Sequence, residues 1–258
     1  MTKGNAIINP VKGKNSPDLG PVAIMVSNAG DLRCLRNLLN LDENKSSNLF
    51  MSRLYRGQGD TDGLSIAGPF IGAPYATILL ETLIAWGARK ILFFGLCGAI
   101  SQNIRIGDII VPAGSVVDEG TSKHYKGEGA GSGERGSGNH KDDICLAYPS
   151  DQIVERTREA LKDKDLSFNE GIVWSTDALF RETCEKVEHF QKIKVLAVEM
   201  ETSAMFTVGN FRDVEVGGIL VVSDELSTFK WQTGFKDKHF EKSRKAACEV
   251  ISSLWKKI

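Results

Sequence analysis

Acidic side chains follow two buried apolar runs of the sequence. Glu199 and Glu201 flank Met200 directly after one run, and Ser223 and Asp224 follow another. α/β enzymes place working groups just past the carboxyl ends of buried strands. Carboxylates there can stabilise a developing positive charge or transfer a proton. Each can also cap the helix or turn that follows, and the residues alone leave this open.

A third apolar run leads into glycines. The run Ile91–Gly95 continues as Leu96-Cys97-Gly98, and we expect a turn after the strand. Glycines in such a turn let backbone N–H groups approach an anion or a sugar closely. A Gly-x-x-Gly pair alone has low specificity, because many strand ends carry one for structural reasons. We expect these glycines to converge with Glu199–Glu201 and Asp224 at one site.

The elements that would position these residues alternate along the chain. Several of the predicted strands are continuously apolar, as in strands that are covered on both faces. They are Val22–Val26, Leu64–Ala67, Ile91–Gly95, Asp108–Val111, Ser115–Val117, Gly171–Trp174, Lys194–Val198 and Gly217–Val222. Strands that alternate with helices predict a largely parallel or mixed sheet between helix layers.

Three segments between or after these strands predict helices. Pro74 opens an apolar-periodic segment that Gly87 closes, and Ser150–Lys162 is rich in helix formers. The last segment has one apolar face at spacings of three and four. Its members are Phe240, Ala247, Val250, Ile251, Leu254 and Trp255.

Composition excludes several classes of function. The chain has 258 residues and a formal net charge of −1, so nothing global attracts it to nucleic acid or to an anionic membrane. No apolar run approaches the ~20 residues that span a bilayer. The start of the sequence lacks the apolar core of a secretory signal, so we expect a cytoplasmic protein. Five cysteines without a CxxC pair suggest neither a disulfide framework nor a metal site.

One stretch is too rich in glycine and serine to bury a core. It runs over residues 126–139 and reads KGEGAGSGERGSGN. We expect a mobile loop there. It is either a tolerated surface insertion or a lid beside a binding site.

The conjunction of segments resembles the nucleoside phosphorylase superfamily, which holds hexameric purine nucleoside phosphorylases, uridine phosphorylases and methylthioadenosine nucleosidases. GPFIGAP, GLCGAI with IGDIIVP, AVEMET and VVSD occur in the family's order. The similarity extends from Val22 to Val250, and residues 118–125 and 173–177 resemble a bacterial and archaeal branch. The resemblance implies a single α/β domain with a central mixed β-sheet that forms a distorted barrel flanked by helices.

The resemblance also implies roles at the sugar and the base. Glu201 would bind the ribose hydroxyls, with Met200 beneath the sugar and Glu199 in support. Asp224, beside Ser223, would protonate the base as the glycosidic bond breaks. A Ser-Asp pair there favours a purine or purine-like nucleoside.

Further roles are implied around these groups. Phe180 would stack on the base, and His124, Cys97 and Gly98 would contact the substrate.

Phosphate would be the co-substrate, with no cofactor and no metal. Gly95 and Ser27 would line its pocket. Arg53 or Arg56 would reach it from a neighbouring subunit. The resemblance therefore also implies a homo-oligomer, a dimer or a hexamer, with shared active sites.

Two positions depart from the phosphorylase pattern. Phe93 and Leu96 stand where phosphorylases place an Arg and a Ser or Thr, and a phosphate dianion needs Arg forks or several backbone donors. Asp31 aligns with the acidic residue that activates water in the nucleosidases. A hydrolytic nucleosidase therefore remains an alternative to a phosphorylase, as does a nucleoside-binding protein that has lost catalysis. Asp31 can also simply cap a helix.

Overall fold

The computed structural model describes residues 6–125 and 144–258. Its strands are β1 (Val22–Val26), β2 (Ser47–Leu49), β3 (Ser52–Arg56), β4 (Leu64–Gly68), β5 (Lys90–Ala99), β6 (Ile109–Asp118), β7 (Leu146–Ala147), β8 (Asn169–Thr176), β9 (Ala197–Glu199), β10 (Glu215–Glu225) and β11 (Gln232–Thr233). Its α-helices are α1 (Ala29–Leu38), α2 (Ala73–Ala85), α3 (Asp151–Asp163), α4 (Cys184–Lys192), α5 (Thr202–Arg212) and α6 (Lys238–Leu254). Short 3₁₀ turns include η3 (Ser122–His124) and η4 (Leu179–Arg181).

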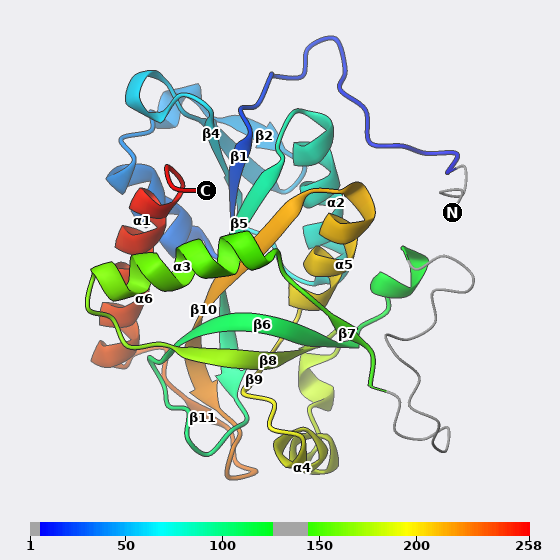
Figure 1. Cartoon of the computed structure of the whole chain (residues 1–258), viewed down its shortest axis with the longest axis vertical. Helices are drawn as coiled ribbons and strands as arrows, with labels where there is room; N and C mark the ends of the chain where they lie inside the picture. Colours follow the sequence, from blue (N-terminus) through cyan, green and yellow to red (C-terminus); the bar gives the residue numbers. More distant parts are fainter. Residues whose placement is uncertain (1–5, 126–143) are drawn as a thin grey trace.

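The strands form one mixed sheet that closes on itself (Figure 1). The order runs β11-β10-β6-β8-β9-β5-β1-β4-β3-β2, and β10 also pairs with β5. That extra pairing makes a ring of β10, β6, β8, β9 and β5, from which β1 to β4 extend. The expected barrel-like mixed sheet is therefore confirmed.

Helices cover both faces of the sheet. One buried cluster contains Leu79 and Leu83 of α2 with Phe206 of α5, and another contains Leu35 of α1 with Ile251 of α6. Alternate residues of β1 enter the two clusters, because successive side chains of a strand point to opposite faces. Both faces are apolar, which explains the continuous apolar runs of the sequence.

The predicted helices are confirmed and several predicted strands are corrected. The two predicted strands Asp108–Val111 and Ser115–Val117 are one strand, β6, which begins at Ile109 and continues through a bulge between Pro112 and Gly114. The segment Lys194–Val198 becomes regular only at Ala197. No apolar run in the sequence predicts β2, β3, β7 or β11, because these strands are short or carry polar residues.

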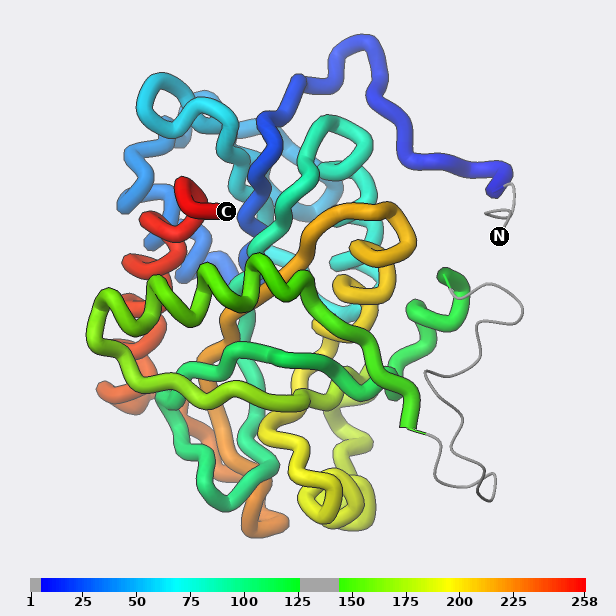
Figure 2. Tube along the Cα trace, viewed as in Figure 1, coloured from blue at the N-terminus to red at the C-terminus, as the bar shows by residue number. Residues whose placement is uncertain are grey.

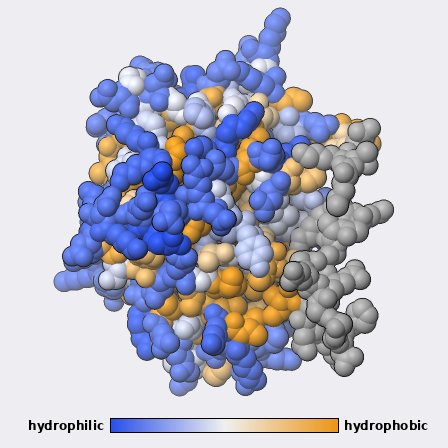
Figure 3. Space-filling model, in the orientation of Figure 1, coloured by the Kyte–Doolittle hydropathy of each residue, from blue (hydrophilic) through white to orange (hydrophobic). Residues whose placement is uncertain are grey.

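Three expectations from the sequence concern segments outside the barrel and the surface. The predicted Gly/Ser loop at 126–139 lies outside the described residues. Within the described ranges, no helix is long and apolar enough to cross a membrane. The chain before β1 runs along the outside of the molecule (Figure 2), where Leu19 N donates to Trp86 O at 3.0 Å. The face in Figure 3 is largely hydrophilic, with hydrophobic residues gathered in its lower half.

Candidate active site

The glycine segment lies within β5 and does not form the turn that we expected. β5 continues to Ala99 because it stays paired with β10 along its whole length. On its other side β5 pairs with β1 only as far as Phe94, and its pairing with β9 begins at Gly98. In the described part of the chain, no strand pairs with Gly95–Cys97 on this edge. The sheet therefore opens here and leaves backbone groups of Gly95–Cys97 without a strand partner on this edge. We call this edge of β5 the floor of the candidate site.

Asp224 lies against this floor at the end of β10. The register of β10 on β5 jumps from Val222–Cys97 to Asp224–Gly98, so Ser223 is an extra, bulged residue. Bulges re-aim side chains beside active sites. A Cβ on Gly98 would lie 3.1 Å from Asp224 Oδ2, so glycine allows the carboxylate to approach the strand closely.

Several groups act on the Asp224 carboxylate. Ser223 Oγ donates to Oδ1 at 2.6 Å, and Trp231 Nε1 donates to Oδ2 at 2.8 Å. Burial raises the pKa of Asp224, and the two hydrogen bonds oppose this rise because they favour the charged form. Burial and the charge of Asp224 raise the pKa of Glu182 to about 7, while Lys186 acts in the opposite direction.

Glu199 is a buried carboxylate that caps α5. It accepts from the backbone N–H groups of Glu201 and Thr202, each at 2.7 Å, and from Ser175 Oγ. Burial raises its pKa and these donors oppose the rise. Glu199 can therefore cap α5 and support the sugar site at once, because the same hydrogen bonds fix the backbone of Glu201.

Glu201 begins α5 and faces the start of α2. Its Oε1 accepts from the backbone N–H of Gly72, the N-cap residue of α2. Burial raises the pKa of Glu201 to about 8, and the charge of Glu199 contributes to the rise. Met200 between the two carboxylates is half-buried. GPFIGAP thus supplies a backbone donor to the carboxylate that is expected to hold the sugar.

Comparison with known proteins identifies the family. The profile described as "Phosphorylase superfamily" matches residues 21–256. The chain belongs to the phosphorylase superfamily. Guanosine phosphorylase of Halorubrum lacusprofundi is 27% identical over 212 residues, which cover 81% of this chain and 80% of that protein. DeoD-type purine nucleoside phosphorylase of Clostridium novyi is 27% identical over 199 residues, covering 76% of this chain and 79% of that one.

Solved structures share the fold. Uridine phosphorylase of Vibrio fischeri matches with a TM-score of 0.75 and 23% identity, over 94% of this chain and 96% of that one. The 5′-methylthioadenosine/S-adenosylhomocysteine nucleosidase of Helicobacter pylori matches with a TM-score of 0.71 and 18% identity, over 93% and 99% of the chains. The resemblance that was drawn from the sequence motifs is confirmed at the level of the family and the fold.

The phosphorylase-superfamily position that was expected to carry an Arg is a core position in this chain. Phe93 is buried and packs against Phe206, with ring centroids 5.8 Å apart. It also lies over Gly218, where a Cβ would come within 2.3 Å of the Phe93 ring. Leu96 is half-buried against the second cluster. Neither side chain can bind phosphate.

The expected phosphate-pocket residues separate into two groups. Ser27 and Gly95 lie together, since a Cβ on Gly95 would be 3.7 Å from Ser27 Oγ. Arg53 and Arg56 are exposed on β3, which β1 and β4 separate from β5. Three strand spacings are about 14 Å. Neither arginine lies at the floor formed by its own chain.

Asp31 is engaged by a cation. It is 3% exposed, and Arg244 of α6 donates to Oδ1 through Nε at 3.0 Å and through Nη2 at 2.7 Å. Asn28, the N-cap of α1, donates to Oδ2 and accepts from the Asp31 backbone. A carboxylate with these partners stabilises the start of α1 and is poorly placed to accept a proton from water.

Of the remaining predicted contacts, Phe180 and His124 are exposed and Cys97 is buried. Phe180 in η4 is 91% exposed, and His124 is exposed at the end of η3. Cys97 is buried, and burial with the charges of Asp224 and Glu199 raises the pKa of its thiol. Sequence reasoning missed Glu182, Trp231 and Gly72. Only Gly72 had a signal, since it precedes the helix-opening Ala73-Pro74.

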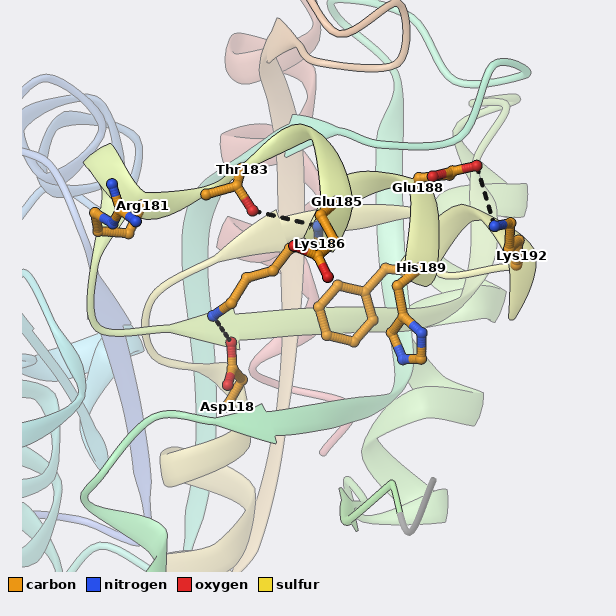
Figure 4. Close-up of a pocket in the computed structure, with 9 residues that line it drawn as sticks. Asp118, Arg181, Thr183, Glu185, Lys186, Glu188, His189 and Lys192 are labelled. Atoms are coloured by element: carbon orange, nitrogen blue, oxygen red, sulfur yellow. Dashed lines mark hydrogen bonds and ion pairs between the residues drawn. The ribbon is translucent and has the colours of Figure 1, made fainter. Parts of the chain in front are cut away.

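A cavity of about 740 Å³ along α4 does not contain the candidate site (Figure 4). It is lined largely by charged residues, four of which form two ion pairs. Lys186 pairs with Asp118 at 2.7 Å, and Lys192 pairs with Glu188 at 3.0 Å. None of the carboxylates at the ends of β9 and β10 lines it. The ends of β5, β9 and β10 therefore define the candidate site.

The raised pKa of Glu201 predicts a specific pH dependence of stability. Between its usual 4.5 and about 8, folded Glu201 holds a proton that the unfolded chain releases. Unfolding is therefore favoured as pH rises through this window. We expect E201Q, which has no such proton, to gain stability relative to the parent between about pH 5 and pH 8. Melting temperatures at several pH values test this, and a pH-independent difference would contradict it.

Proposed function

We propose that this protein is a nucleoside phosphorylase that cleaves the N-glycosidic bond of a purine nucleoside with phosphate, giving the free base and a pentose 1-phosphate. The observation that carries the proposal is the arrangement around Gly98. This residue pairs with Val198 of β9 on one side and with Asp224 of β10 on the other. The end of β9 leads to Glu201, so a carboxylate for the sugar and an acid for the base flank one strand.

The sugar-side carboxylates match the charge that develops in the reaction. Departure of the base leaves an oxocarbenium-like sugar, which nearby carboxylates stabilise electrostatically. Glu199 is fixed by three donors, and Glu201 is held by Gly72 at the start of α2. Ribose hydroxyls that donate to Glu201 would favour its ionised form just where positive charge appears.

The base-side acid matches the leaving group. A purine leaves as a poor anion unless a ring nitrogen is protonated, and an acid there contributes 10²–10⁴-fold. Burial raises the pKa of Asp224, which makes it a better proton carrier near neutral pH. The relatives named guanosine and purine nucleoside phosphorylase support a purine. Exposed Phe180 is available to stack on the base.

Phosphate would occupy the open edge of β5. Ser27 and Gly95 border this edge, and backbone N–H groups at an edge that no described strand covers suit an anion. Hydrolysis remains the alternative, because Phe93 and Leu96 bring no charge to this edge. The pairing of Asp31 with Arg244 weighs against Asp31 as the base that activates water.

Phosphate dependence is the direct test of the reaction. Adenosine, guanosine, inosine and uridine are incubated with the protein with and without phosphate, and free base and sugar 1-phosphate are quantified. We expect base release to require phosphate and to be faster for the purines. Base release at equal rates without phosphate would establish the nucleosidase, and no release from any nucleoside would contradict both enzymes.

Two carboxylate variants separate sugar recognition from base activation. We expect E201Q to lower turnover by about 10²-fold or more for every substrate, since it removes the charge that faces the sugar. D224N should lose about 10²–10⁴-fold with inosine but little with a 7-methylated purine nucleoside, whose base leaves without an acid. Steady-state kinetics test this at a pH where both variants are folded. Equal losses of D224N on both substrates would limit Asp224 to positioning.

We also propose a homo-oligomer whose contact includes the β2–β3 hairpin. Met51 is 76% exposed and Ile71 is 72% exposed. The hairpin residue Met51 contacts α2, which follows Ile71, because the Tyr75 hydroxyl accepts from Met51 N at 3.0 Å. Ile71 precedes Gly72, the donor to Glu201. A second copy on this apolar surface would bring Arg53 of the same hairpin toward a neighbouring site.

The hairpin contact predicts distinct effects of two substitutions. M51D should shift the protein to smaller species in sedimentation velocity, because it buries a charge in the contact. R53A should keep the assembly but raise the KM for phosphate about tenfold or more, because a charge-assisted hydrogen bond is lost. V11D, at an equally exposed apolar position away from the hairpin, is the control. Unchanged sedimentation of M51D would refute the contact.

A further inference from the structure

Asp224 has one buried donor and one exposed donor. Ser223 is buried, and its Oγ also lies 3.2 Å from the backbone oxygen of Cys97. Trp231 is 65% exposed and donates its indole N–H to Asp224 Oδ2 at 2.8 Å. It lies at the end of the connection from β10 to β11, so its position is set by a surface segment. Each carboxylate oxygen thus accepts one hydrogen bond in this structure.

This arrangement conflicts with the chemistry expected of Asp224. A proton donor needs one oxygen protonated and directed at the base nitrogen, whereas an oxygen that accepts from Trp231 is directed at the indole. Hydrogen bonds to a carboxylate also favour its charged form. Loss of one donor therefore frees an oxygen for the base nitrogen and makes Asp224 easier to protonate. The exposed indole has less packing to lose than the buried hydroxyl.

We propose that Trp231 is a positioning residue that holds Asp224 ionised before the nucleoside binds and releases it when the base enters. The base ring nitrogen then takes the place of the indole N–H at Oδ2. Asp224 takes up a proton from solvent and passes it to this nitrogen as the bond from the sugar carbon to the base breaks. The electron pair of that bond stays with the base, which leaves neutral. This inference rests on the proposed function.

Other titratable groups surround Asp224 and must be separated from it. The charges of Asp224 and of Glu199, which ends β9, both raise the pKa of the Cys97 thiol on β5. Glu182 precedes α4, where Lys186 also acts on it. The pKa of Glu182 near 7 lies in the range where a change at Asp224 is sought. E182Q is therefore needed as a background.

The first experiment uses the ligand-free protein and needs no turnover. Indole fluorescence is titrated with pH in the parent, W231F, D224N and E182Q. Trp86, whose indole donates to Val11 O at the opposite end of the sheet, gives the matched control W86F. We expect a titration in the parent, W86F and E182Q that W231F and D224N lack. A titration that persists in W231F, or is absent from the parent, would overturn the proposal.

The second experiment measures the pH profile of kcat/KM for inosine. W231F keeps the ring but removes the donor, so the alkaline limb should move up by about one pH unit, as expected for one hydrogen bond to a charged group. A 7-methylated purine nucleoside should show no such shift. Superimposable limbs for the parent and W231F would overturn the proposal. If the parent cleaves no nucleoside, the proposed function fails, and the fluorescence titration still decides the role of Trp231.

Discussion

The pairing of β5 with β10 is the constraint on which the rest of the structure depends. It extends from Lys90–Glu215 to Ala99–Glu225 and closes the ring of strands. Because the two strands are parallel, their carboxyl ends meet at the same edge. Gly98 and Asp224 are therefore brought together by the same backbone hydrogen bonds that hold the barrel. The extra residue at Ser223 then turns Asp224 onto the surface of β5.

Carboxylate burial connects stability with the proposed chemistry. Glu199, Glu201 and Asp224 all have pKa values raised by burial, so each one destabilises the fold when it is ionised. The fold offsets this cost with fixed donors from α5, from α2 and from the Ser223 bulge. Those donors also orient the carboxylates. Capping and function are thus served by the same hydrogen bonds, which is why the sequence alone did not separate them.

The sequence predicted the central elements because their signals are local. The apolar run of β1 and the Pro74 start of α2 follow directly from residue types. The continuation of β5 through Gly95–Ala99 had no such signal, since glycines usually interrupt strands and only pairing with β10 keeps them extended. Trp231 and Glu182 reach Asp224 through tertiary contacts that no spacing in the sequence records.

Charge balance ties the choice of nucleophile to assembly. A phosphate dianion needs cations or several directed donors. In the described chain, Phe93 fills the core where an Arg was expected, and the Arg244 charge is already paired with buried Asp31. Backbone groups at Gly95–Cys97 can contribute donors but no net charge. Under the proposed function a second copy can supply a cation, for which Arg53 on the exposed hairpin is the candidate. A water nucleophile would need no such cation, so an effect of Arg53 on phosphate binding would connect the choice of nucleophile with the contact.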